Sequence, residues 1–309
     1  MTKPIYQQYH QDVPLTNLSV AYTSDVFVAP QLFPIIPVQR LSDKYFVYNK
    51  GDWRRRQAEI RAPGTRAPRG GYSLSTGNYL CAEWSFATTV TDEQVRNSNA
   101  PLSPLSDGTK FVTHQLLAEM ESQVAATAFG SSVWSGSATP STLWSVPSST
   151  PMEDVETGFE TIVAAIGNMP NVGIMGYNVF SDLKNHPDIV ERIKYTSGPT
   201  SPAIVTLQAL AALFGLNKLL VGTENENTAE EGVTDSMSFI WGKHLLIAYV
   251  AGGASLMTPS AGYVPTYQNR VIERYREEQE KQDVITGYWN FDVLATATDA
   301  GYLFKSVVA

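Results

Sequence analysis

Residues 15–55 read LTNLSVAYTSDVFVAPQLFPIIPVQRLSDKYFVYNKGDWRR, and this stretch joins an extended apolar segment to the start of a basic hairpin. Its first part has no helical periodicity, and its prolines keep the chain extended. It nevertheless contains large apolar side chains, among them Phe27, Phe33, Ile35 and Ile36. An extended apolar segment needs a groove, either on its own body or on a neighbouring molecule. We therefore treat these four residues as candidates for a contact between chains.

The second part of the stretch begins a long basic hairpin over residues 44–91. Residues 45–53 are rich in aromatic and β-branched side chains, and residues 79–90 alternate with the two-residue period of a strand. Prolines and glycines lie between them with few apolar side chains, so we expect a projecting flap. Residues 40–70 carry nine basic and three acidic side chains, a net charge of +6, whereas the remainder of the chain carries −14.

Three consecutive arginines, Arg54, Arg55 and Arg56, lie in this flap. Basic residues beside Pro/Gly-rich sequence can follow the phosphates of a nucleic acid, or they can contact an acidic protein surface. No nucleic-acid-binding module surrounds them, so the hairpin context favours a protein contact. We expect the acidic partners on an adjacent copy of the chain to be Glu273, Glu277, Glu278 and Glu280.

The rest of the chain predicts a mixed body of helices and strands. A capping box at Thr91 and Gln94 opens a short helix. A ridge of apolar residues at helical spacing predicts a long helix over 110–129. The ridge consists of Val112, Leu116, Met120, Val124 and Ala128. From residue 171 onward short strands mix with short helices, and the mixed charges of 273–283 predict an exposed helix or an edge segment.

Composition excludes several classes of protein. The chain has 309 residues, is 43% hydrophobic and 17% charged, and carries a net charge of −8, which is ordinary for a globular protein. Its longest apolar runs are far shorter than the ~20 residues of a membrane helix, and no secretory signal is visible. The single cysteine, Cys81, excludes a disulfide framework and is expected to be a buried hydrophobic residue.

Motifs of catalysis and ligand binding are absent from the sequence. It contains no nucleotide-binding, metalloprotease or nucleophile-elbow motif. The four histidines, including His114 and His186, are scattered without metal-ligand spacing. The acidic run over 224–235 lacks the spacing of a calcium loop and predicts a solvated loop. We therefore predict no catalytic residues, no cofactor and no metal.

The order of the elements resembles that of tailed-bacteriophage major capsid proteins, which have the Hong Kong 97-type fold. Residues 15–55 look like their N-terminal arm running into the extended loop. HPDIVERIKYTSG (186–198) and LAALFGLNKLLVG (210–222) are similar to their axial domain. FIWGKHLLIAYV (239–250) and GYWNFDVLATATDAGYLF (287–304) look like the return into their peripheral domain.

The resemblance implies an α+β chain in four parts. These are an N-terminal arm at 1–43, an extended β-hairpin loop at 44–85, an axial domain at 170–260, and a discontinuous peripheral domain at 86–169 and 261–309 with a spine helix at about 110–129.

The same resemblance implies a structural protein of the virion. Such a subunit self-assembles as hexamers and pentamers into an icosahedral shell, which encloses double-stranded DNA without sequence-specific binding and without a membrane. The host cytoplasm is the expected place of assembly. No long charged helical segment precedes the arm, so we expect a separate scaffolding protein, besides a portal and possible decoration proteins. The alternatives are an encapsulin-like bacterial nanocompartment shell, and an α/β enzyme with an unrecognised site.

Overall fold

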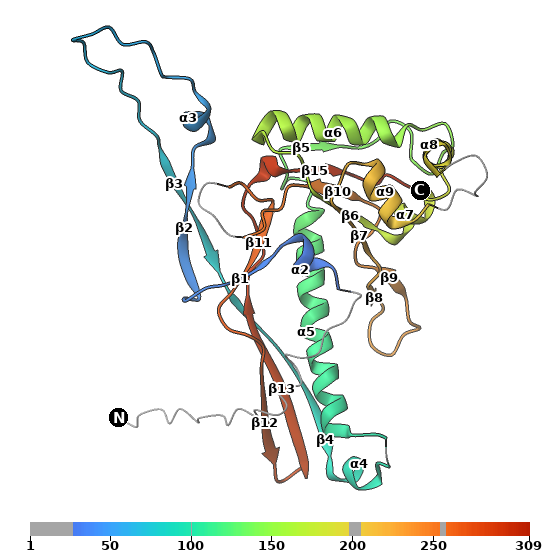
Figure 1. Cartoon of the computed structure of the whole chain (residues 1–309). Coiled ribbons are helices and arrows are strands. Elements are labelled where there is room, and N and C mark those ends of the chain that lie inside the picture. Colours follow the sequence, from blue (N-terminus) through green and yellow to red (C-terminus); the bar gives the residue numbers. More distant parts are fainter. Residues whose placement is uncertain (1–26, 100, 198–204, 254–257) are drawn as a thin grey trace.

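The computed structural model describes residues 27–99, 101–197, 205–253 and 258–309. The chain is elongated, with a body at one end from which a long helix and a narrow sheet run to the opposite tip (Figure 1). A two-stranded flap projects from the side of this arrangement. Residues 1–26 of the expected N-terminal arm lie outside the described residues.

The long helix, α5 (Pro104–Ala128), confirms the helix predicted from the apolar ridge. All five ridge residues are buried, because this face of α5 packs on the narrow sheet. The helix begins at Pro104, earlier than the predicted residue 110. Proline is favoured in the first turn, where its missing N–H would have no helical partner.

The narrow sheet is built from distant parts of the chain. Its strands are β1 (Ile35–Pro37), β4 (Ala82–Thr91), β11 (Gly262–Thr266), β12 (Val271–Glu277), β13 (Gln282–Phe291) and β14 (Leu294–Ala295). β13 pairs antiparallel with β4, β11 and β12, and β1 pairs parallel with β11. The segment 273–283 is an edge strand and a turn rather than a helix, because its residues pair along β13. The capping box at Thr91 opens α4 (Asp92–Asn97), as predicted.

A second sheet forms the centre of the body. Its strands, in spatial order, are β5 (Gly136–Ala138), β15 (Gly301–Phe304), β10 (Leu245–Ala248), β6 (Val172–Gly176) and β7 (Lys218–Gly222). Every residue of β6, β10 and β15 is buried, as in sheets that are covered on both faces. The surrounding helices are α6 (Pro151–Ile166), α7 (Tyr177–Leu183), α8 (Pro187–Ser197) and α9 (Leu207–Leu213).

The body sheet combines ranges that the sequence analysis kept apart. β6, β7 and β10 come from the range expected to form the axial domain. β5 and β15 come from the ranges expected in the peripheral domain, and β15 lies between β5 and β10. The C-terminal strand is thus an inner strand of the body sheet, although it is last in the chain.

The flap is the antiparallel pair β2 (Ser42–Tyr48) and β3 (Leu74–Leu80). The strand predicted over 45–53 ends at Tyr48, because Asn49 caps a short helix, α3 (Lys50–Arg54). The Gly51 N–H donates to the Asn49 side chain at 2.9 Å, which offers the backbone a helical turn in place of a strand. Beyond α3 the chain continues as an exposed loop.

The remaining elements are short. They are α2 (Ala29–Leu32), the 3₁₀ helix η1 (Thr298–Ala300), and the hairpin of β8 (Asn225–Asn227) and β9 (Met237–Phe239). This hairpin carries the acidic run, which is mostly exposed as predicted, although Glu224 is buried. Cys81 is buried between β3 and β4, and burial raises the pKa of its thiol. Across the described ranges, the helices are too short or too polar to span a membrane.

Candidate contact surfaces

The four apolar residues of the N-terminal segment have different environments. Phe33 is fully buried and Phe27 is 7% exposed, so both rings belong to the core of their own chain. This corrects the expectation that they contact another molecule. Ile36 is partly buried within β1, whereas Ile35 is 42% exposed and remains available to a neighbour.

A buried carboxylate, Glu121, attaches this segment to α5. Its Oε1 accepts a hydrogen bond from the Val28 N–H at 3.0 Å, and its Oε2 accepts one from the Ala29 N–H at 2.9 Å. These N–H groups lie at the start of α2, where no helical carbonyl is available to them. The Trp241 indole N–H, from the turn after β9, donates to Oε1 at 2.6 Å. One side chain therefore joins three distant segments of the chain.

Burial raises the pKa of Glu121 above its usual range, although the three N–H donors act in the opposite direction. The sequence analysis did not single out this residue. Its position was a usable signal, since it lies four residues after Leu117 and three before Val124, on the buried side of α5.

The body also contains a buried serine–histidine pair, which is one arrangement that a nucleophilic enzyme uses. Ser149 Oγ lies 3.0 Å from His186 Nε2. The Asp188 N–H donates to His186 Nδ1 at 3.3 Å, so the ring proton is on Nε2, directed at Ser149 Oγ and at Val146 O. Histidine in this tautomer cannot accept the serine proton. Both residues are buried, and the pair is a structural contact.

Potential metal ligands do not cluster in the described part of the chain. No group of three or more His, Cys, Asp or Glu side chains lies close enough together there to hold an ion. His114 and Glu224 approach each other, with Nε2 and Oε1 3.7 Å apart, but no third ligand joins them.

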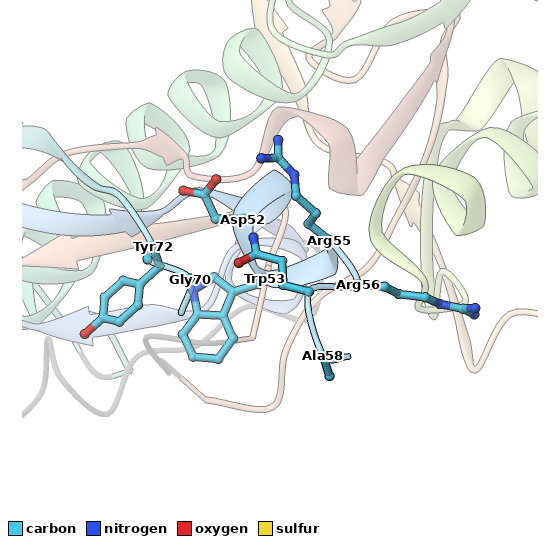
Figure 2. Close-up of a pocket in the computed structure, with 9 residues that line it drawn as sticks. Asp52, Trp53, Arg55, Arg56, Ala58, Gly70 and Tyr72 are labelled. Carbon is cyan, nitrogen blue, oxygen red and sulfur yellow. The ribbon is translucent and has the colours of Figure 1, made fainter. Parts of the chain in front are cut away.

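An open pocket of about 550 Å³ lies at the base of the flap loop (Figure 2). Its wall includes Trp53, Arg55, Arg56 and Tyr72. The rings of Trp53 and Tyr72 are 5.7 Å apart between centroids, and each is also 5.9 Å from Tyr48. Figure 2 shows the Arg55 and Arg56 side chains extending away from the Trp53 ring in different directions. The flap thus presents exposed aromatic rings beside two outward cations.

Arg54 differs from its two neighbours, because its guanidinium group forms hydrogen bonds within its own chain. Its Nη1 donates to the Ala165 carbonyl at 3.1 Å, and its Nη2 donates to the Ile166 carbonyl. Both carbonyls belong to the last turn of α6. Of the three arginines proposed for a contact between chains, Arg55 and Arg56 therefore remain the stronger candidates.

The expected acidic partners lie along β12 and its turn. Glu273 is partly buried, and burial followed by the charge of Glu83 raises its pKa. Glu277 and Glu280 both accept hydrogen bonds from the Gln282 side-chain amide, at 2.6 and 2.5 Å. The neighbouring Glu277 raises the pKa of Glu280, as expected for crowded carboxylates. Glu278 is exposed at the same turn.

An ion-pair network that the sequence analysis did not single out anchors this acidic turn. Arg276 forms a bidentate pair with Asp92 of α4, with distances of 2.6 and 2.7 Å, and lies 3.7 Å from Asp283. The turn and α4 thus form one end of the molecule, whereas α3 and the flap loop lie at the opposite end (Figure 1). The basic and acidic candidates cannot meet within a single chain.

Comparison with known proteins shows which family shares this arrangement. No protein-family model matches the chain. The major capsid protein of Burkholderia phage BcepMu is 27% identical over 308 residues and covers 96% of each chain. The major capsid protein of Pseudomonas phage JBD67 is 21% identical over 324 residues, covering 96% of this chain and 97% of its own.

The chain is thus similar over nearly its whole length to bacteriophage major capsid proteins. Its fold agrees with this assignment. The solved structure of a phage-related protein from Bordetella bronchiseptica has a TM-score of 0.76 at 24% identity, covering 97% of this chain and 98% of that one. The capsid structure of cyanophage P-SCSP1u has a TM-score of 0.59 at 10% identity, covering 88% and 86%. The predicted Hong Kong 97-type α+β fold is confirmed, and the relatives, which are structural capsid proteins, imply a structural rather than an enzymatic role.

Proposed function

We propose that the chain is a bacteriophage major capsid protein, which forms hexamers and pentamers that build a closed icosahedral shell around double-stranded DNA. The observation that carries the proposal is the match to phage major capsid proteins along 96% of the chain. The shape of the subunit supports it, because a projecting flap and a distant acidic turn are poorly suited to a solitary monomer but supply contacts in a lattice.

The division into an arm (1–43), an extended loop (44–85), a peripheral domain (86–169 and 261–309) and an axial domain (170–260) remains part of the proposal. We add one refinement to it. β5 and β15 are strands of the body sheet and α6 packs against it, so we assign all three a structural role in supporting the axial domain.

The contact between subunits is proposed to be electrostatic as well as apolar. Arg55 and Arg56 of one subunit face Glu277, Glu278 and Glu280 of another. One exposed ion pair contributes only ~0 to 1 kcal/mol. A shell repeats each contact in every subunit, so small individual contributions add up across the lattice.

The charge of the chain supports the enclosure of DNA. Outside residues 40–70 the net charge is −14, so most of the surface repels phosphates. A wall of this kind does not hold packaged DNA through the counterion release that drives non-specific binding. Scaffolding, portal and decoration proteins, and assembly in the host cytoplasm, complete the proposal.

The test is assembly of the full chain, alone and together with a candidate scaffolding protein. Electron microscopy and size-exclusion chromatography should show capsomers or closed particles. Particles that contain an enzyme in place of DNA would favour the nanocompartment alternative. A monodisperse 33.9 kDa monomer at every salt concentration, with no particles in infected cells, would overturn the proposal.

A further inference from the structure

The short helix α3 connects the two strands of the flap to each other. Asp52 Oδ2 accepts hydrogen bonds from the Ser73 N–H at 2.8 Å and from the Ser73 hydroxyl at 2.6 Å. The Asn49 side-chain amide donates to the Ser73 hydroxyl at 3.2 Å. Ser73 directly precedes β3, whereas Asn49 follows β2, so these bonds close the ribbon at the point where its strands end.

The same helix is attached to the body by two cations. Lys50 forms an ion pair with Asp299 of η1, and Arg54 donates to the Ala165 and Ile166 carbonyls of α6. α6 ends at Gly167 in the left-handed conformation, which leaves carbonyls of its last turn without helical partners. A guanidinium at this end also interacts favourably with the negative end of the helix dipole.

Apart from α3, the ribbon meets the body at its base. There the Leu80 N–H donates to Asp292 Oδ2 at 3.0 Å, and Cys81 beside it is buried. Most side chains of β2 and β3 are exposed, and Figure 1 shows the ribbon standing away from the body between these two attachments. A two-stranded ribbon has little rigidity of its own. A ribbon held at two points keeps a fixed angle, whereas one held only at its base can swing.

We propose that α3 is a two-sided clasp that sets the angle of the flap within each subunit. Asn49 and Asp52 keep the flap strands together, and Lys50 and Arg54 fasten the closed ribbon to η1 and α6. When the contacts of Lys50 and Arg54 with the body break, the two strands of the ribbon move together about its base. The clasp is a property of the single chain, so it stands independently of the proposed shell. If the shell is correct, the clasp also determines where Arg55 and Arg56 are presented to a neighbour.

The test measures the distance between flap and body in the unassembled full chain. Spin labels on Ala58→Cys in the flap loop and Glu160→Cys on the exposed side of α6 report that distance by double electron–electron resonance. Cys81 is buried and should not react with the label. The parent should give a narrow distribution, and Lys50→Ala with Arg54→Ala should give a broadened one.

A matched control is Arg55→Ala with Arg56→Ala, which removes the same charge from adjacent positions. Within the described ranges neither of these arginines forms a hydrogen bond or ion pair with the body, so the distribution should stay narrow. Asp299→Asn removes the Lys50 partner without changing α3 and should broaden the distribution in part. This variant keeps the test decisive if the double substitution fails to fold.

Charge exchange provides a further check. Lys50→Asp with Asp299→Lys restores an opposite-charge pair in reversed order, and it should narrow the distribution relative to Lys50→Asp alone. An unchanged distribution in both Asp299→Asn and the double alanine variant would overturn the clasp. Equal broadening in the Arg55 and Arg56 control would also overturn it, because the effect would then follow from charge alone.

Discussion

At the residue scale, a single buried carboxylate attaches the start of α2 to the long helix α5. Glu121 satisfies two N–H groups of α2 and the indole N–H of Trp241, none of which has access to water. Buried donors of this kind are costly when they lose their acceptor. The residue therefore stabilises the structure through the groups it pairs, even though burying its own charge is unfavourable.

We expect Glu121→Gln to destabilise the chain by ~1.5 to 3 kcal/mol, the usual range for a hydrogen bond to a charged group. The amide places an N–H₂ where an acceptor is needed, so at least one donor of α2 loses its partner. Thermal unfolding of the unassembled chain measures this loss. Glu119→Gln is the matched control, because Glu119 bonds only to the nearby Gln123 side chain on the same helix. Equal effects of the two substitutions would contradict the role of Glu121.

The pair of Asp92 and Arg276 has a distinct pH signature. The hydrogen bonds from Arg276 hold the pKa of Asp92 below its usual value of about 4. The folded pKa is thus lower than the unfolded one, so the stabilisation is fully present above pH ~4 and is lost as the pH falls through the folded pKa. We expect Asp92→Asn to lower the melting temperature at pH 7, and the difference from the parent should shrink below pH ~4. Glu93→Gln, on the same helix, leaves the pair of Asp92 and Arg276 in place and is the matched control at pH 7.

At the element scale, the described part of the N-terminal segment packs within its own chain. The part from Phe27 onward is core material, since α2 is capped by Glu121 and β1 is a strand of the narrow sheet. The part before it is outside the described residues. A truncation that removes Phe27 and the residues after it should therefore lower the stability of the chain.

Deleting residues 1–36 should unfold or strongly destabilise the chain, because it removes Phe27, Leu32 and Phe33 from the core at ~1.5 to 3 kcal/mol per side chain. Deleting residues 1–26 keeps all three side chains, so the difference in melting temperature between the two truncations reports the contribution of residues 27–36. Circular dichroism with thermal unfolding compares the two truncations. Similar stability of both proteins would show that the segment after residue 26 is not needed by the core.

At the scale of the whole molecule, opposite charges are placed at opposite ends. The flap loop carries Arg55 and Arg56, and the turn after β12 carries Glu277, Glu278 and Glu280. This separation prevents the groups from neutralising one another within a chain. Under the proposed function, the arginines of one copy instead contact the glutamates of the next copy. Such a head-to-tail contact can repeat through a lattice.

We expect Arg55→Glu with Arg56→Glu to reduce particle yield most at low salt, where repulsion between like charges is least screened. The melting temperature of the unassembled chain should stay the same, because both side chains are exposed. Adding Glu277→Arg with Glu280→Arg should recover part of the yield, whereas Glu226→Arg with Glu230→Arg in the exposed hairpin of β8 and β9 should not. Normal yield of the double-glutamate variant at low salt would exclude this contact.

Local patterns in the sequence were enough to predict several elements and the resemblance to a capsid fold. The apolar ridge of α5, the capping box at Thr91 and the burial of Cys81 were predicted correctly, because helical periodicity and capping depend on residues a few positions apart. The order of the elements was enough to indicate the phage capsid fold. The strand predicted over 45–53 was too long. It ends at Tyr48, because the Asn49 side chain bonds to the backbone of α3 and favours a helical turn over a strand.

The partners of side chains that bond across the chain could not be predicted from local patterns and are known from the tertiary structure. Glu121 bonds to a residue 93 positions away, and Arg54 to one 112 positions away. The sequence around a charged residue can be the same whether its side chain faces solvent, a neighbouring subunit or a helix end of its own chain. The buried position of β15 likewise depends on its pairing with β5 and β10. These outcomes follow from how the whole chain packs, because burial and pairing are set by contacts in space and not by spacing along the sequence.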